Sequence, residues 1–221
     1  TSGTTVDGNP DGSWTDKAGA EGAVNDSWEI KTCDRTIVVH TAPNTYTVKY
    51  NGNGNNGGST ANSTHIYDVE KNLTKNGFVK TGYIFVGWNT SANGSGTSYA
   101  DKASVKNLSS TNGATITLYA QWTANQYQLT LNPNNGSFSD GTTVAKTLNP
   151  DLIYNGYNWC DISSQKVSRT GYTFDGWYDK ASGGEKVYDV NGSCVTGTYW
   201  KNNIYQHTGN LTVYAHWAPK S

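Results

Sequence analysis

Apolar and polar positions alternate with a period of two in several short segments of the chain. Successive side chains of a β-strand point to opposite faces, so this pattern predicts half-buried strands. The alternating sets are Tyr46, Val48 and Tyr50; Tyr127, Leu129 and Leu131; Ile116, Leu118, Ala120 and Trp122; and Leu211, Val213, Ala215 and Trp217.

Turn signals separate these segments. Asn-Gly pairs recur along the chain, for example at Asn51-Gly52, Asn93-Gly94 and Asn135-Gly136. Both residues of such a pair tolerate a positive φ, which tight hairpin turns require. Short strands joined by tight turns predict a mostly β protein.

Two near-copies of one unit fill most of the chain. Their matching blocks begin at Tyr46 and Tyr127, at Thr81-GYIFVGW and Thr170-GYTFDGW, and at Thr117-LYAQW and Thr212-VYAHW. The offset between the copies grows from 81 to 89 to 95 residues, so the extra residues lie between the blocks. This spacing predicts two small domains, 46–122 and 127–217, with long loop insertions in the second.

Residues 1–43 precede both copies as a separate segment. Its Thr36-IVVHTA-Pro43 run resembles Thr212-VYAHWA-Pro219 near the end of the second copy. We therefore expect the segment to be the tail of a diverged upstream unit.

A stretch of the first copy has helical spacing. Ile66, Val69 and Leu73 follow an i, i+3, i+7 pattern, and Asn76-Gly77 would end a helix. The corresponding stretch of the second copy contains Pro150, which does not suit a helix interior. We expect one short helix or an irregular crossover in each copy.

In the GYxFxGW block, simple alternation does not place the tryptophan on the core side of the strand. Strict alternation would place Trp177 on the same face as Asp175, which should face water. A bulge at the glycine before each tryptophan would rotate the indole inward. We therefore expect Trp88 and Trp177 to be buried core anchors.

Composition narrows the class of protein. The net charge is −1 and charged residues make up only 15% of the 221 residues, which argues against nucleic acid or an anionic membrane as partner. Tyr and Trp are abundant, together with Gly, Asn, Ser and Thr, a mixture more typical of extracellular β-proteins than of cytosolic enzymes. No apolar run approaches the roughly 18–20 residues of a membrane span.

Cysteines distinguish the second copy from the first. Cys160 and Cys194 both lie in its insertions, which suggests a disulfide that ties two long loops together. The alternative is two unpaired thiols. Cys33 is left over, either free or paired elsewhere.

The combined motifs resemble a known family. Tyr-x-V-x-Y/L-N-x-N-G, then R/K-T-G-Y-x-F-x-G-W, then L/V-Y-A-x-W, is similar to the Listeria–Bacteroides repeat, also called the internalin B-repeat family. The resemblance covers about residues 46–122 and 127–217. It implies a β-grasp-like, ubiquitin-like α+β unit, and a role in adhesion or display on bacterial surfaces. It implies no catalytic residues, and places the motif residues at core and turn positions.

Two groups of residues are candidates for binding. Asp7, Asn9 and Asp11 have the alternate oxygen ligands that open a calcium loop, although Ala18 stands where a bidentate carboxylate is needed. We therefore expect no cofactor, with calcium as the alternative. Aromatic side chains in the insertions suit sugar stacking or a protein hot spot, and the alternative is a small core beneath the loops. These aromatics are Tyr154, Tyr157, Trp159, Tyr199, Trp200 and Tyr205.

The residues and the resemblance together lead to one functional expectation. The chain is a non-enzymatic, extracellular tandem-repeat region of a bacterial surface protein, which acts as an adhesin stalk or adhesion module at the cell surface or cell wall. The alternative is a glycan- or protein-binding module that uses the aromatic loops of the second repeat. The expected partner is a protein or glycan of a host or neighbouring cell, and the fragment itself is expected to be a monomer.

Overall fold

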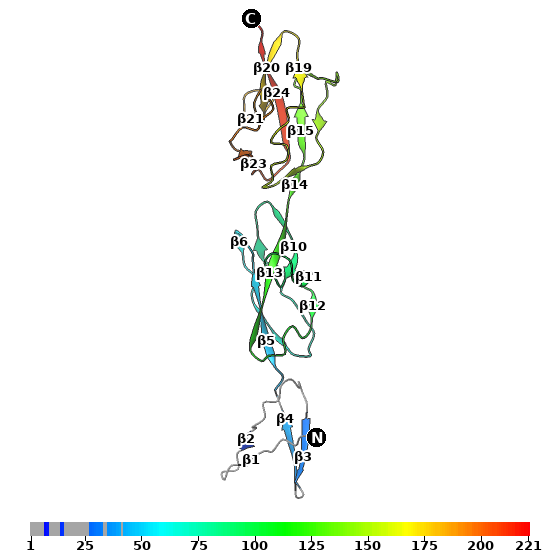
Figure 1. The fold of residues 1–221 in the computed structure, drawn as a ribbon, viewed down its shortest axis with the longest axis vertical. Coiled ribbons are helices and arrows are strands. Elements are labelled where there is room, and N and C mark those ends of the chain that lie inside the picture. Colours follow the sequence, from blue (N-terminus) through cyan, green and yellow to red (C-terminus); the bar gives the residue numbers. More distant parts are fainter. Residues whose placement is uncertain (1–6, 9–13, 16–26, 33–34, 41) are drawn as a thin grey trace. The chain divides into compact units, whose positions relative to one another are not determined.

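The computed structural model describes residues 7–8, 14–15, 27–32, 35–40 and 42–221 (Figure 1). The described residues form strands, turns and irregular segments without a helix, which confirms the mostly β prediction. Within these ranges there is accordingly no helix long and apolar enough to cross a bilayer.

The first repeat is built on a five-stranded mixed sheet of order β11-β10-β13-β5-β7. Its central strands β5 and β13 are parallel, with Tyr46 opposite Ala114 and Tyr50 opposite Leu118. The predicted alternation is confirmed in both strands. The bounds are β5 (Thr45–Asn51), β7 (Ser63–Ile66), β10 (Tyr83–Asn89), β11 (Ser98–Tyr99) and β13 (Ala114–Ala124). Two short pairs accompany the sheet, β6 (Gly57–Gly58) with β9 (Phe78–Val79) and β8 (Lys71–Asn72) with β12 (Ser104–Val105).

The second repeat has a sheet of corresponding order, β17-β15-β24-β20-β21, which runs through the upper part of Figure 1. Its parallel pair is β15 with β24. The bounds are β15 (Leu129–Asn132), β17 (Lys146–Thr147), β20 (Tyr172–Tyr178), β21 (Lys186–Tyr188) and β24 (Leu211–Pro219). Short pairs are β14 (Gln126–Tyr127) with β18 (Leu152–Ile153), β16 (Ser137–Phe138) with β19 (Val167–Ser168), and β22 (Trp200–Lys201) with β23 (Ile204–Tyr205).

Two strand pairs lie in the N-terminal segment. They are β1 (Asp7–Gly8) with β2 (Trp14–Thr15), and β3 (Ser27–Thr32) with β4 (Arg35–His40). Strand β4 covers most of the run that resembles the end of the second copy. The origin of the segment as the tail of an upstream unit stays a prediction.

By its internal contacts the chain divides into two compact units. The first comprises residues 1–53, 58–78 and 87–121, and the second comprises 54–57, 79–86 and 122–221. Two short segments that belong to the first copy by sequence, 54–57 and 79–86, therefore belong to the second unit by contact.

Of the two alternatives expected around Ile66, Val69 and Leu73, a short helix or an irregular crossover, the helix is wrong. Strand β7 ends at Ile66, a turn follows in which Asp68 has a φ of 64°, and β8 begins at Lys71. Leu73 is buried, whereas Ile66 and Val69 are exposed and His65 is buried instead. The β-branched residues and the pairing of β7 with β5 outweigh the weak helical spacing. The β-grasp-like detail of the fold stays a prediction.

The two tryptophans of the GYxFxGW blocks are buried, as predicted. Trp88 is 0% exposed and Trp177 is 1% exposed. Before each lies a glycine with positive φ, 147° at Gly87 and 120° at Gly176, and the pairing of β20 with β24 shifts register just before Gly176. The bulge thus turns the indole from the outer face into the core.

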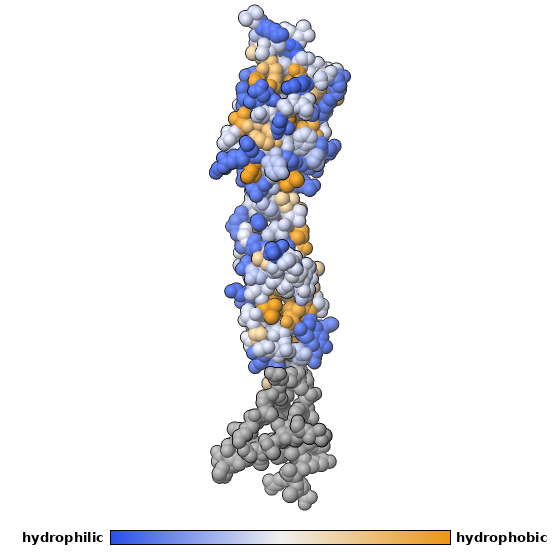
Figure 2. Space-filling model, viewed as in Figure 1, coloured by the Kyte–Doolittle hydropathy of each residue, from blue (hydrophilic) through white to orange (hydrophobic). Residues whose placement is uncertain are grey.

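The rest of each block keeps strict alternation. Phe85 and its counterpart Phe174 are half-buried, while Asp175 is exposed, as predicted. In the first copy the outer positions are apolar, and Ile84 and Val86 are 60% and 57% exposed. Figure 2 shows small groups of hydrophobic residues among hydrophilic ones on the visible face of the described residues, as on most protein surfaces.

Candidate functional site

The predicted aromatic residues of the second repeat divide into buried and exposed members. Trp200 and Tyr205 are both 0% exposed. Tyr157 is 81% exposed, and Tyr154, Trp159 and Tyr199 are half-buried. We call the segments that carry them, 154–162 and 190–207, the loop cluster.

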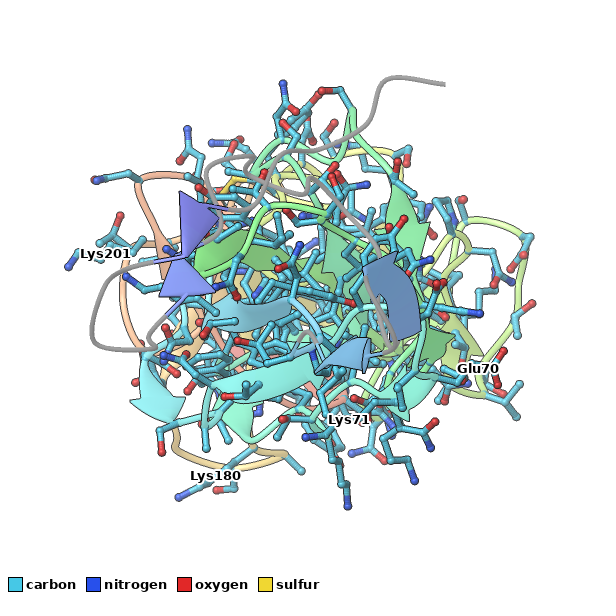
Figure 3. The ribbon with its side chains drawn as sticks, turned by 90° about the horizontal axis from the view of Figure 1, so that it is seen from below. Glu70, Lys71, Lys180 and Lys201 are labelled. Carbon is cyan, nitrogen blue, oxygen red and sulfur yellow. A yellow bond between two sulfur atoms is a disulfide. The ribbon has the colours of Figure 1, made fainter. Side chains whose placement is uncertain are left out.

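A tight hairpin places the two buried aromatics. Trp200 lies opposite Tyr205 across β22 and β23. The connecting residues Asn202 and Asn203 have φ of 51° and 64°, which asparagine tolerates and a two-residue hairpin turn requires. Lys201 next to the turn points outward from the repeat (Figure 3). The chain therefore reverses at Asn202 and Asn203. The charged Lys201 lies on one face of the hairpin, and the aromatic Trp200 and Tyr205 lie on the other.

Trp200 packs between two tyrosine rings. The distances between ring centroids are 5.9 Å to Tyr188 and 5.3 Å to Tyr205, both edge-on. Burial raises the pKa of Tyr188 and of Tyr205 far above the ordinary tyrosine value. These rings belong to the main core of the repeat, so a ligand could not stack on Trp200 or Tyr205 without displacing that core.

The predicted disulfide between Cys160 and Cys194 is present and ties the two insertions together. The two Cα atoms lie 4.8 Å apart, and the residues are separated by 34 positions in the sequence. Backbone bonds run beside it: the Cys194 N–H donates to the Cys160 carbonyl at 2.7 Å, and the Ile162 N–H to the Gly192 carbonyl at 2.8 Å. The disulfide therefore closes the loops over the aromatic core.

The less buried aromatics do not converge on one surface. The Trp159 indole N–H donates to the Pro150 carbonyl. The Tyr199 hydroxyl donates to Asp179 at 3.0 Å, and burial together with that carboxylate raises the pKa of Tyr199 to about 12. Tyr154 packs edge-on against Tyr83 within the second unit, at 5.6 Å between centroids. Tyr157 is the member with a largely free face.

Two of the hollows in the described residues lie in the second unit. One, of about 150 Å³, lies beneath the disulfide-tied loops and is lined by Ile162, Ser163, Gln165, Lys166, Val167, Phe174, Trp177, Val190, Asn191 and Gly192. The other, of about 300 Å³, has mostly polar walls formed by Asn134, Asn135, Arg169, Ala181, Ser182, Gly183, His216 and Trp217. Neither brings together the paired carboxylates or the nucleophile and base of a hydrolytic centre.

The described residues offer few candidates for a metal site or a cysteine nucleophile. Three His, Cys, Asp or Glu side chains do not gather there as metal ligands would. Of the predicted calcium ligands, Asp7 lies in β1, while Asn9 and Asp11 lie outside the described residues, as does Cys33. Cys160 is bound to Cys194 and so has no thiolate to act as a nucleophile.

The structural role of an asparagine that occurs in both copies was not predicted from the sequence. Asn53 donates through its side-chain amide to the carbonyls of Ala92 and Ala120, at 2.8 and 2.9 Å. Asn134 does the same in the second repeat, to Ala181 and Ala215, both at 2.9 Å. The N-x-N-G motif is therefore more than a turn, because it bonds a loop and the last long strand to the turn. The matching of Asn53 and Asn134 between the copies was the available signal.

Comparison with known proteins finds similar sequences among putative membrane proteins and an internalin of bacteria. A putative Gly-rich membrane protein of Evansella cellulosilytica is 29% identical over 88% of this chain and 28% of its own length. Internalin H of Listeria monocytogenes is 29% identical over 62% of this chain and 19% of its own length. A second putative membrane protein of Evansella cellulosilytica is 29% identical over 47% of the chain. The chain thus spans less than a third of the length of these relatives.

The family model of the Listeria-Bacteroides repeat domain matches residues 46–121 and 127–216. Those ranges cover most of the two five-stranded sheets, the two buried tryptophans that follow positive-φ glycines, and Asn53 and Asn134 with their bonds to the last long strand. The chain belongs to the Listeria-Bacteroides repeat family, of which it carries two tandem copies.

Proposed function

We propose that the chain is a non-enzymatic, extracellular repeat region of a bacterial surface protein, and that it serves as a spacer in adhesion. The observation that carries this proposal is the position of the repeated motif residues. Trp88 and Trp177 are 0% and 1% exposed and lie in separate cores, and Trp177 only borders the small hollow beneath the loops. The duplicated residues stabilise each repeat separately. This is typical of proteins in which the number of repeats sets the length of the array.

Three further observations support the proposal. The family relatives include an internalin and putative membrane proteins, all several times longer than this chain. The disulfide between Cys160 and Cys194 fits an oxidising compartment outside the cytosol. The two hollows described above do not bring together paired carboxylates or a nucleophile and a base.

A replacement experiment tests the spacer role. In a bacterium that displays the parent protein, residues 127–217 are deleted in one strain and replaced by a second copy of 46–122 in another. A spacer predicts that adhesion to host cells falls on deletion and returns on replacement, because a unit of similar size restores the reach. Loss in both strains, with equal surface amounts, would contradict the proposal.

The alternative is a glycan- or protein-binding module that uses the loop cluster. Tyr157 favours it, since most of that ring is free to stack on a ligand. A glycan array and a pull-down with the intact chain test this alternative. Specific binding that is lost in Tyr157→Ala, with unchanged unfolding, would support the binding module and not the spacer.

A further inference from the structure

The two copies present the same surface at the start of strands β10 and β20. In the first copy this surface is formed by Lys80, Gly82 and Tyr83, which lie in the second unit by contact. We call it the covered surface, because another part of that unit lies on it. Its counterpart in the second copy, formed by Arg169, Gly171 and Tyr172, is called the open surface.

A single tyrosine fills the covered surface. The ring of Tyr154 meets the ring of Tyr83 edge-on, with centroids 5.6 Å apart. A Cβ atom on Gly82 would lie 2.2 Å from a carbon of the Tyr154 ring, so only glycine leaves room for it. The Asn125 N–H donates to the Gly82 carbonyl at 2.8 Å, and the Tyr154 N–H donates to the Asn125 carbonyl at 2.9 Å. The chain that leaves the first copy is thus bonded to the same glycine on which the tyrosine packs.

The open surface repeats this geometry. Gly171 has a φ of 80°, against 77° at Gly82. Lys220, which follows Trp217 at the distance at which Asn125 follows Trp122, donates its N–H to the Gly171 carbonyl at 2.9 Å. A cation lies over the tyrosine in both places: the Arg169 guanidinium is 3.8 Å from the Tyr172 centroid, and the Lys80 ammonium is 4.4 Å from the Tyr83 centroid.

What differs is the occupant. Apart from Gly171 and its two chain neighbours, no described residue has an atom within 4 Å of the place where a Cβ of Gly171 would stand. Gly171 is exposed, whereas Gly82 is buried. The open surface therefore has the shape, the backbone bond and the cation of the covered one, but not the aromatic ring.

We propose that the open surface is the docking site for an aromatic side chain of a further repeat of this family, joined after Lys220 and seated as Tyr154 is seated on Gly82. The occupant follows from continuity with the covered surface, because the bond from Lys220 to Gly171 directs the chain as the bond from Asn125 to Gly82 does. A glycine lacks a Cβ that would hold a flat ring away, and the neighbouring tyrosine offers an edge for an aromatic pair. This inference goes beyond the proposed function, since it holds whether or not the repeats act as a spacer in adhesion.

An extended chain tests the docking. Residues 126–217 are repeated directly after Lys220, so that the joint after the second copy has the same sequence of elements as the joint after the first. Proton NMR then follows the Hα resonances of Gly171 and Gly82, which an aromatic ring packed on the glycine shifts. We expect the Gly171 resonances to move from their position in the 221-residue chain by about the amount that Tyr154→Ala moves those of Gly82.

Matched substitutions identify the ring. In the extended chain, alanine in place of the appended tyrosine that corresponds to Tyr154 should return Gly171 to its original resonance and leave Gly82 unchanged. Tyr154→Ala in the original copy should do the reverse. Gly82 therefore reports in the same sample that the known contact has formed.

Two results would overturn the proposal. One is a Gly171 resonance that stays unchanged in the extended chain while Gly82 still responds to Tyr154→Ala. The other is a Gly171 resonance that moves with concentration in the 221-residue chain, because the occupant would then be a second molecule. Neither result bears on adhesion by the bacterium, so the failure of this proposal and that of the spacer role are distinguishable.

Discussion

At the scale of the residue, the largest aromatic side chains of the described repeats lie in the cores. Trp88, Trp177 and Trp200 are the largest fully buried side chains of the described residues. Each lies against other rings, as Trp88 does against Tyr50 at 4.8 Å between centroids. Composition alone made the aromatic loops candidates for binding, and their burial gives most of that aromatic surface to the core.

Replacement of a buried ring should therefore cost far more than replacement of an exposed one. Trp200→Ala should lower the free energy of unfolding of the second repeat by about 3–5 kcal/mol, through lost burial and the cavity left behind. Tyr157→Ala, at 81% exposure, should change it by no more than about 0.5 kcal/mol. Urea unfolding followed by circular dichroism measures both. Equal costs would show that Trp200 is not a core residue.

A buried histidine makes the first repeat sensitive to pH. His65 is 0% exposed and stacks on Tyr46, and its Nε2 shares a hydrogen bond with Ser63 at 2.8 Å. Burial, and then the charge of Lys71, lowers the pKa of His65 from the ordinary 6.5. The folded chain thus disfavours the imidazolium that the unfolded chain accepts.

The sign of the pH effect follows from this lowered pKa. The unfolded state takes up a proton at higher pH than the folded state does, so the contribution of neutral His65 is fully present well above pH 6.5 and is lost as the pH falls below it. Urea unfolding of the first repeat at a series of pH values measures the effect, and His65→Gln should flatten it in this window. An unaltered slope in His65→Gln would contradict the assignment.

At the scale of the element, the glycine bulges decide which side of a strand enters the core. A Cβ on Gly176 would lie 2.8 Å from the Tyr188 carbonyl oxygen, and one on Gly87 would lie 2.8 Å from that of Tyr99. Both positions combine a positive φ with a neighbouring backbone, which glycine alone tolerates. Without the bulge, Trp177 would lie on the outer face beside Asp175.

A matched pair of glycines separates these two causes. Gly176→Ala should destabilise the second repeat by roughly 2–4 kcal/mol, since backbone strain adds to the displaced carbonyl of Tyr188. Gly141→Ala has a positive φ of 83° but no described atom within 4 Å of its Cβ, so it should cost only about 1 kcal/mol. Denaturant unfolding of the two variants gives the comparison. Similar costs would mean that the close approach in the bulge is unimportant.

At the scale of the whole molecule, the two repeats differ mainly in their insertions. The sheets have corresponding strand orders, and each has its own parallel central pair. The second alone carries a disulfide, between residues 34 positions apart, and the sequence from 46 to 122 contains no cysteine. One repeat should therefore respond to reduction and the other should not.

Calorimetry with and without a reducing agent tests this difference. Loss of the bond between Cys160 and Cys194 should lower the stability of the second repeat by about 4 kcal/mol, on the chain-entropy account of a loop of this length. One of two unfolding transitions should move to lower temperature while the other stays in place. In the double variant Cys160→Ser, Cys194→Ser the reducing agent should have no further effect, and a shift of both transitions would contradict separate cores.

Much of the fold could be predicted from the sequence, because it depends on short motifs and on comparison of the two copies. The strands, the burial of Trp88 and Trp177 and the pairing of Cys160 with Cys194 followed from period, turn chemistry and comparison of the copies. Over Ile66 to Leu73, where a short helix or an irregular crossover was expected, the helix is absent because pairing of β7 with β5 outweighed a weak local spacing. The candidate site fared less well, because a pattern of aromatic residues does not say which rings lie beneath a loop.

The amino-acid sequence alone predicts a tandem of two mostly β units of one family, because duplication and a period of two are visible in short stretches of neighbouring residues. The folded chain was needed to show which aromatic rings of the insertions are buried, and that Gly82 is covered while Gly171 is open. Those facts depend on contacts between residues far apart in the chain, such as Gly82 with Tyr154, and the spacing of residues along a sequence does not contain them.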